Sequence, residues 1–363
     1  MARPAKAIIN LEALRHNFQL AASLCSPGLA LAVVKANAYG HGAVPVAQAL
    51  ADLAPAFGVA CIEEALELRA AGIEQPILLL EGIFSADEVS IAAENNFWLM
   101  LENEQQFLAL ENASVTEALK VWLKVDTGMH RLGLSVEDLM PAYRRMHACK
   151  NVDKTIVVAT HFACGDDLES EMTSQQIACL RDAARDLGAP LSLANSPGIL
   201  AWPQAIAEWN RPGFMLYGNS PFSVAQAEAD TLQAVMTLKS AIISLREVVA
   251  GESVGYAASW TATRTTKIAT IAMGYGDGYP RQAPSGTPVL VNGQRAPLVG
   301  RVSMDMITVD VSDIDSVAIG DEVILWGDNL SANEVAGHAG TIGYEVLTRM
   351  PMRTPRIYSE VNI

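Results

Sequence analysis

Residues 29–42 read LALAVVKANAYGHG, an apolar run typical of a buried strand that ends at Lys35. Seven more such runs follow, separated by Ala- and Leu-rich segments such as CIEEALELRAA (61–71), which has near-helical spacing of its apolar residues. The eight runs are 29–36, 56–60, 76–82, 97–102, 121–127, 156–162, 191–195 and 208–211. Strand and helix alternating in this way predict an α/β fold, a (β/α)8 TIM-type barrel over residues 12–225.

The alternative for this region is a doubly wound open sheet. The span is short for a barrel, and Pro212 ends the eighth run early because proline cannot donate a hydrogen bond to a sheet. The eighth strand is therefore the least defined of the set, and the closure of the barrel depends on it.

The sequence changes character beyond residue 225, where helical periodicity fades. β-rich runs follow at 232–249, 267–273, 288–291, 304–311 and 322–325, with turns such as Asn292-Gly293 between them. These runs predict a mainly β domain over residues 226–363, with one short helix near 331–338 that has Ser331 as its N-cap. Residues 7–11 also resemble a strand, and we expect segment 1–11 to pair with the β domain.

The composition is that of a globular protein with an ample core, since 50% of the 363 residues are apolar and 18% are charged. The formal charge of -15 opposes binding to nucleic acid or to a membrane surface. No apolar run is long enough to cross a membrane and no signal-peptide core is present, so we expect a cytoplasmic protein. The five cysteines lack disulfide or zinc-ligand spacing, which predicts reduced thiols and no metal site.

Reactive side chains follow several of the predicted barrel strands, whose ends meet at one face of a barrel. Lys35 ends the first strand, where scarce water favours a neutral amine that can form a Schiff base; the alternative is a lysine that reaches out to solvent. Arg131 follows the fifth strand, where its planar cation could hold a carboxylate. His161 ends the sixth; alone, it would be interpreted as a core histidine.

The loops after the seventh and eighth strands contain Asn195-Ser196 and Gly213-Phe214. Barrels that bind phosphorylated ligands commonly hold the phosphate at these two loops, against backbone N–H groups. A lysine at one strand end and a phosphate cradle across the barrel mouth together suggest pyridoxal 5'-phosphate (PLP) as cofactor.

Nine motifs extend this pattern over nearly the whole chain, and in their order and spacing the sequence resembles the alanine racemase family. The motifs are VVKANAYGHG (33–42), KVDTGMHRLG (124–133), HFA (161–163), NSPG (195–198), RPGFMLYG (211–218), VGYAASWTA (254–262), GYGDGYPR (274–281), VGRVSMDM (299–306) and GTIGYE (340–345). Ala257 and Ser303 depart from residues common in the family, and neither is a proposed catalytic group.

The resemblance implies a two-base racemisation of L- and D-alanine. Lys35 would bind PLP covalently and act on one face of the substrate Cα, while Tyr256 would act on the opposite face, since inversion needs a proton removed on one side and delivered on the other. It also implies that Tyr256 reaches the Lys35 of a partner subunit, so that a homodimer shares its active sites. Without the resemblance, Tyr256 would be interpreted as a packed aromatic of the β domain.

The remaining roles are also implied by the resemblance. Arg211 would donate to the pyridine nitrogen of PLP, and a guanidinium cannot accept a proton there, which disfavours reactions other than reprotonation at Cα. His161 would orient Arg211. The other residues expected to hold the cofactor are Tyr39, Asn195, Ser196, Gly213, Phe214 and Tyr344.

For the substrate, the resemblance implies that Arg131 meets the PLP phenolic oxygen and the alanine carboxylate. Lys124 matches a position at which many members have a carbamylated lysine. The sequence itself does not show whether Lys124 is carbamylated. Tyr275, Met304 and Asp305 match residues that the partner subunit contributes to the substrate pocket; alone, they would be interpreted as surface residues.

Three other functions compete with this one, and Arg211 and the β domain argue against the first two. A PLP-dependent decarboxylase of the same architecture has an acidic residue in the place of Arg211, and a non-catalytic PLP carrier lacks the β domain. A racemase of broader amino-acid range fits the same motifs. The product would serve either peptidoglycan synthesis or alanine breakdown.

Overall fold

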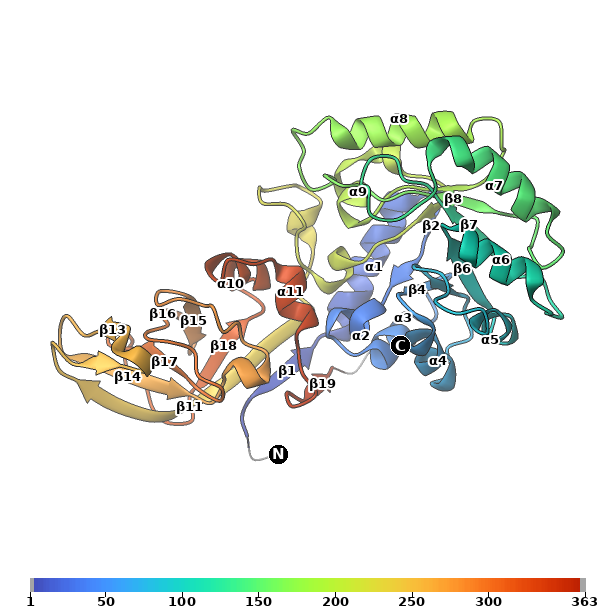
Figure 1. Ribbon diagram of the computed structural model, residues 1–363. Coiled ribbons are helices and arrows are strands. Elements are labelled where there is room, and N and C mark those ends of the chain that lie inside the picture. The colour runs from blue at the N-terminus through green and yellow to red at the C-terminus, as the bar shows by residue number, and fades with distance from the viewer. Residues whose placement is uncertain (1–2, 360–363) are drawn as a thin grey trace.

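Strands and helices alternate through the first part of the chain, which the computed structural model describes over residues 3–359 (Figure 1). Seven strands form a parallel sheet in sequence order, β3 to β9. They are β3 (Ala32–Val33), β4 (Phe57–Val59), β5 (Ile77–Leu79), β6 (Phe97–Leu101), β7 (Val121–Lys124), β8 (Val157–Ala159) and β9 (Leu191–Ser192). Strands β4 to β8 are buried at every position, as expected of parallel strands covered on both faces.

The sheet closes through β10 (Trp209–Asn210), which pairs in parallel with β2 (Leu29–Ala30). The backbone N–H of Leu31 donates to Asn210 at 2.8 Å, and that of Arg211 donates to Ala194, just past β9, at 2.9 Å. The eighth strand therefore bonds on both sides. This confirms the predicted barrel and excludes the open sheet.

Helices surround the barrel. They are α1 (Leu11–Cys25), α2 (Lys35–Tyr39), α3 (Ala43–Leu50), α4 (Ile62–Ala70), α5 (Glu88–Glu94), α6 (Glu104–Asn112), α7 (Val136–Ala148), α8 (Met172–Ala184) and α9 (Ser196–Ala201), with 3₁₀ turns η1 (Pro203–Ala205), η2 (Phe214–Tyr217) and η3 (Ala229–Thr231). Several have polar caps that the sequence supplies directly; the side chain of Asn10, for example, accepts from Ala13 at 3.0 Å. Most of these helices connect one barrel strand to the next, but α2 and α3 both lie between β3 and β4, and η2 and η3 follow the last barrel strand, β10.

The β domain extends away from the barrel (Figure 1) and contains a sheet in the order β16-β15-β18-β11-β1-β19, to which β14 is attached through β11 and β17 through β14, together with a separate two-stranded sheet of β12 and β13. Its strands are β1 (Lys6–Ile9), β11 (Met236–Val248), β12 (Ser253–Val254), β13 (Trp260–Thr261), β14 (Thr266–Ile271), β15 (Pro288–Val291), β16 (Gln294–Pro297), β17 (Ile307–Asp310), β18 (Glu322–Trp326) and β19 (Arg356–Tyr358). Turns η4 (Tyr256–Ala258) and η5 (Tyr275–Asp277) and helices α10 (Ala332–His338) and α11 (Gly343–Thr348) complete it.

The first strand belongs to this domain, because β1 lies antiparallel to β11 and parallel to β19. The predicted helix near 331–338 is confirmed, and Ser331 Oγ accepts from the N–H of Glu334 at 3.0 Å. The predicted ranges 1–11 and 226–363 include residues 1, 2 and 360–363, which lie outside the described residues.

One predicted strand, 304–311, begins later than expected. Strand β17 starts at Ile307 because the backbone before it turns, with the N–H of Ser303 donating to Met306 at 3.0 Å. The carbonyls of Ser303 and Met304 instead accept from Tyr275 and Gly276 at 3.0 and 2.9 Å. Met304 therefore lies in a loop fastened to η5.

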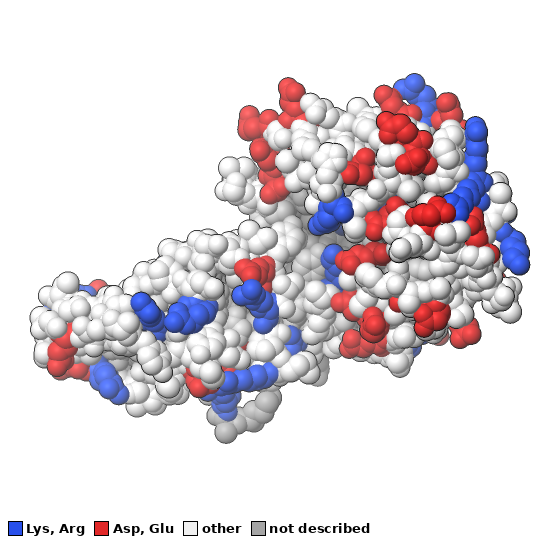
Figure 2. Space-filling model, viewed as in Figure 1, with Lys and Arg blue, Asp and Glu red and all other residues white. Residues whose placement is uncertain are grey.

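The main buried core runs from the barrel interior into the β domain, with large side chains such as Trp122, Phe57 and Trp326 fully buried, and a small second cluster around Val248 and Ile268 lies within the β domain. Asn17 of α1 reinforces the junction, because its amide donates to the carbonyls of Leu216 and Gln233 at 3.1 and 2.8 Å. Acidic and basic side chains are both spread over the visible face, and Lys, Arg and acidic side chains together border the hollow where the two domains meet (Figure 2).

Across residues 3–359, no helix has both the length and the apolar character needed to cross a membrane.

Candidate active site

A cavity of about 760 Å³ lies at the carboxyl ends of the barrel strands. Its wall brings together most of the residues singled out in the sequence. These are Lys35, Tyr39, Lys124, Arg131, His161, Asn195, Ser196, Arg211, Gly213, Phe214 and Tyr344. All come from strand ends or the loops after them except Tyr344, which α11 of the β domain contributes. The cavity thus lies between the two domains of one chain.

One side of the cavity has a cradle of hydroxyl and backbone N–H groups around Ser196. Ser196 Oγ accepts from the N–H of Gly213 at 2.9 Å and of Met215 at 3.3 Å. Its own proton remains available for a ligand. Asn195 caps α9, since its Oδ1 accepts from Gly198 at 3.1 Å, which fixes the loop that carries Ser196.

Gly213 leaves space that another residue would fill, because a Cβ there would lie 2.7 Å from Tyr39 Oη. Phe214 begins η2, and the first N–H groups of a helix have no partner within it. The cradle therefore offers hydroxyl and amide donors around an opening next to Tyr39. This arrangement suits a phosphate.

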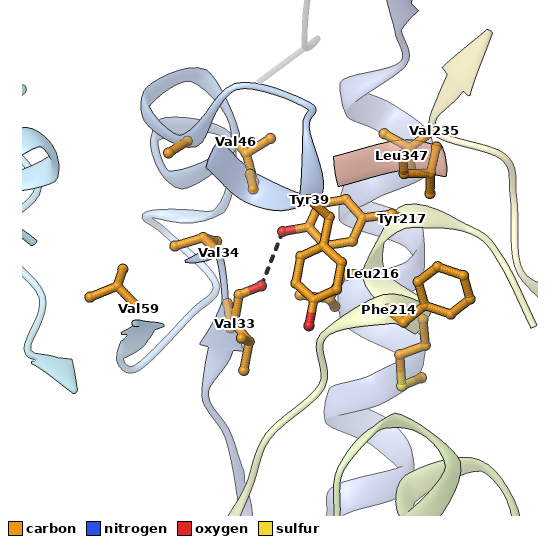
Figure 3. Close-up of a cluster of buried hydrophobic side chains, with 14 of the residues drawn as sticks. Val33, Val34, Tyr39, Val46, Val59, Phe214, Leu216, Tyr217, Val235 and Leu347 are labelled. Atoms are coloured by element: carbon orange, nitrogen blue, oxygen red, sulfur yellow. Dashed lines mark hydrogen bonds between the residues drawn. The ribbon is translucent and has the colours of Figure 1, made fainter. Parts of the chain in front are cut away.

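Two tyrosines of the cradle are held by stacking. Tyr39 stacks on Tyr217 with ring centroids 4.8 Å apart, and Tyr217 donates to the carbonyl of Val33 at 3.0 Å (Figure 3). Tyr344 stacks on Phe214, which also lines the cavity, at 3.6 Å. Burial raises the pKa of Tyr39 to about 12, and burial also raises the pKa of Tyr344. Both hydroxyls are therefore protonated donors at neutral pH.

Arg211 lies at the base of the cavity and is only 5% exposed. Its Nη1 donates to the carbonyl of Ser192 at 3.0 Å and to Ser192 Oγ at 2.5 Å, and its Nη2 donates to the carbonyl of Thr160 at 2.6 Å. Nε remains as a donor that a ligand could use. Burial lowers the pKa of Arg211 to about 10, so the guanidinium stays charged at neutral pH.

Ser192 and Thr160 are not among the site residues predicted from the sequence, although each is a polar residue in or directly after an otherwise apolar strand. Their bonds to Arg211 orient the guanidinium through the backbone carbonyls of both residues and through Ser192 Oγ. The role predicted for His161, to orient Arg211, stays a prediction. Burial and then the nearby Arg211 and Lys124 hold the pKa of His161 well below its usual range, so the imidazole is neutral.

Lys124 ends β7 and is 9% exposed. Burial, followed by the charges of Arg211 and Arg131, lowers the pKa of Lys124 to about 8. The charge of Glu102 acts in the opposite direction and raises the pKa of Lys124. Glu102 Oε2 is buried without a hydrogen-bond partner among the described residues. Burial raises the pKa of Glu102, and the charge of Lys124 opposes that rise. The cavity is therefore rich in positive charge and suited to an anionic ligand.

Four predicted site residues do not line this cavity. Tyr256 lies in η4 of the β domain and is 69% exposed, and Tyr275 and Met304 are also exposed. Asp305 accepts from Arg353. All four are on the surface of the β domain, where a second chain could meet them.

The loops that carry three of these residues are fastened by Asp277, which is fully buried. Its carboxylate accepts from Arg3 Nη2 at 2.6 Å, from Arg353 Nε at 3.0 Å and from the N–H of Gly274 at 2.9 Å. Sequence reasoning did not single out Asp277. Tyr275, two residues before it, is thereby held in place.

Similarity to known proteins covers the whole of this architecture. Residues 9–221 match the family described as "Alanine racemase, N-terminal domain", and residues 235–358 match "Alanine racemase, C-terminal domain". The chain is 54% identical over 356 residues to an alanine racemase of Pseudomonas taetrolens and to a protein of Pseudomonas putida named "Alanine racemase, catabolic". Each alignment covers 98% of this chain and 99% of the relative.

Solved structures of alanine racemases are also similar to this chain. A biosynthetic alanine racemase from Pseudomonas aeruginosa is similar with a TM-score of 0.95 and 47% identity, over 99% of this chain and 100% of the other. An alanine racemase from Acinetobacter baumannii is similar with a TM-score of 0.93 and 38% identity, over 98% of this chain and 100% of the other.

Proposed function

This chain belongs to the alanine racemase family and is an amino-acid racemase, and from that premise we propose that it interconverts L- and D-alanine by a two-base reaction with PLP bound in the barrel cavity. The observation that carries the proposal is that one cavity brings Lys35, Arg211 and the Ser196 cradle together. A phosphate fits the donors of the cradle and a pyridine nitrogen fits Arg211 Nε. Lys35 offers the amine for the aldehyde.

When bound, PLP supplies an aldehyde that joins the amino group of the substrate and a ring that withdraws electrons from its Cα. The residues of the chain bind the substrate, hold the cofactor and move the proton. Lys35 Nζ removes or returns the proton on one face of Cα. Arg131 pairs with the substrate carboxylate, as a planar cation can do in two parallel hydrogen bonds. Arg211, which stays charged, holds the pyridine nitrogen without giving it a proton, so reprotonation at Cα is favoured.

The second base in this proposal is Tyr256 of a partner chain. Its exposure of 69% supports this role, because a packed aromatic of the β domain would be buried. Tyr275, Met304 and Asp305 would reach the partner's site from the same surface. We therefore propose a homodimer whose two active sites are each built from both chains.

The proposal covers two metabolic roles, because relatives of this chain include one named catabolic and one named biosynthetic. The product would supply D-alanine for peptidoglycan or serve alanine catabolism. We place the enzyme in the cytoplasm, and the five free cysteines support this, since reduced thiols are typical of a reducing compartment.

Chiral chromatography of reactions started with L-alanine and with D-alanine tests the activity, with serine and lysine as further substrates. We expect alanine to be racemised in both directions, and the Lys35→Ala variant to lose both the visible absorbance of bound PLP and the activity. A wild-type protein that stays colourless after purification with PLP would contradict the cofactor assignment.

Exchange of the Cα hydrogen in deuterated water tests the two bases separately. Tyr256→Phe should slow exchange from one enantiomer far more than from the other, because each base serves one face. Tyr143→Phe, in helix α7 away from the cavity, is the matched control and should change neither rate. Equal slowing of both enantiomers by Tyr256→Phe would contradict the two-base scheme.

A further inference from the structure

The segment directly after Lys35 has an unusual backbone. Ala36, Asn37, Ala38 and Tyr39 have φ angles of 52°, 54°, 51° and 50°, which form one left-handed turn. Residues with a Cβ rarely adopt this conformation singly and still more rarely in succession, because the Cβ crowds the next carbonyl oxygen. Such strain persists only where surrounding contacts hold it.

The far end of the turn is held by hydrogen bonds from His41, in the same segment, and from strand β19. His41 Nδ1 donates to the carbonyls of Ala38 and Tyr39 at 3.0 and 2.9 Å. From strand β19, Arg356 Nε donates a hydrogen bond to the carbonyl of Gly40 at 2.6 Å, and Tyr358 Oη donates one to the carbonyl of His41 at 3.0 Å.

The near end, next to Lys35, is held by Glu64 in the first turn of α4. Glu64 Oε1 accepts from the N–H of Ala36 at 2.7 Å, and Oε2 accepts from the N–H of Ala60 at 2.8 Å. Ala60 directly follows β4, the neighbour of the strand that leads to Lys35. One carboxylate thus joins the ends of two adjacent barrel strands at the first residue of the left-handed turn.

We propose that Glu64 is a positioning residue, which keeps Lys35 at the cavity by stabilising the left-handed turn that follows it. The carboxylate is suited to this because both of its oxygens accept from backbone N–H groups. A glutamine has one oxygen and would direct an NH₂ group at the second N–H. The inference rests on the proposed role of Lys35 and adds a residue that does not line the cavity.

Amide hydrogen exchange of the PLP-free protein tests the proposal without reference to activity. In Glu64→Gln, exchange over residues 36–41 should become about tenfold faster or more, because the turn loses a bond that opposes its strain. The matched control is Glu67→Gln, an exposed glutamate on the same helix, which should leave exchange unchanged. The dissociation constant of PLP, from an absorbance titration, should rise about tenfold or more in Glu64→Gln and stay the same in Glu67→Gln.

A second variant separates positioning from general stability. Adding Ala36→Gly to Glu64→Gln removes the Cβ that strains the first residue of the turn, so PLP affinity should recover in part. Equal affinity of Glu64→Gln and Glu67→Gln, no recovery in the double variant, or a loss that merely follows a lower melting temperature of the PLP-free protein would each overturn the proposal. Hydrogen exchange decides the inference even if the wild-type protein takes up no PLP, a result that would contradict the proposed function instead.

Discussion

Replacing Lys124 by methionine should change how the stability of the PLP-free protein depends on pH. Lys124 is buried beside Arg211 and Arg131, with Glu102 opposing their effect, and its pKa in the folded protein is about 8 instead of 10.5. Between these two values the unfolded chain binds a proton that the folded chain has released. The free energy of unfolding contributed by this group therefore rises with pH from about 8 to about 10.5.

The size of the effect follows from the two pKa values. Their separation corresponds to about 3 kcal/mol in the free energy of unfolding, because a tenfold change in an equilibrium is about 1.4 kcal/mol. Below pH 8 the wild-type protein holds a buried ammonium group, and the Lys124→Met variant does not. The variant should thus gain up to about 3 kcal/mol over the wild-type protein at pH 7, and this advantage should disappear by pH 10.5.

Urea unfolding of both proteins at one protein concentration, in buffers freed of carbon dioxide so that Lys124 stays an amine, measures this difference. Subtracting the free energy of unfolding of the wild-type protein from that of the variant removes the contribution of other titrating groups. Cys25 is one of these, since burial raises the pKa of its thiol to about 12. Lys150→Met, at an exposed site, is the control and should show no such pH dependence. If the free energies of unfolding of Lys124→Met and the wild-type protein differ by the same amount at every pH from 8 to 10.5, the reasoning is refuted.

Three further substitutions have expected outcomes. Gly213→Ala should weaken PLP binding about tenfold or more in an absorbance titration while far-ultraviolet circular dichroism is unchanged, because the added Cβ would lie 2.7 Å from Tyr39 Oη; unaltered affinity would argue against the phosphate cradle. Asp277→Ala should lower the free energy of urea unfolding by about 3 kcal/mol, since it removes the buried carboxylate that accepts from Arg3, Arg353 and the N–H of Gly274; a loss below about 1 kcal/mol would contradict this. Asn17→Ala should cost about 2 kcal/mol in the same assay, because the amide joins α1 to the start of the β domain; no loss would show that the junction does not depend on it.

Most of the fold could be predicted from the sequence because the barrel strands are short, apolar and regularly spaced. The elements that the sequence missed have weak local patterns. Helix α11 has six residues, too few for a helical period to be seen, yet it brings Tyr344 to the cavity. The left-handed turn was missed because ANAY contains no glycine, and only contacts from α4 and β19 make that conformation stable.

The site was predictable for residues at strand ends, since the barrel brings those ends together. The partners that orient them were not predictable in this way. Thr160 acts on Arg211 through its carbonyl oxygen, which every residue has, and Ser192 acts through its carbonyl as well as its hydroxyl, so the residue types alone do not point to these contacts. Glu64 and Asp277 act on backbone groups or on residues far along the chain, and only the folded structure shows these contacts.

Mixing two inactive variants tests most directly whether one active site needs two chains. Lys35→Ala lacks the first base and Tyr256→Phe lacks the second, so each homodimer should fail to racemise alanine. If the subunits exchange freely, half of the dimers are mixed and each mixed dimer has one intact site, which predicts about a quarter of wild-type activity. A mixture that stays as inactive as its components, although mass spectrometry shows mixed dimers, would contradict the shared site.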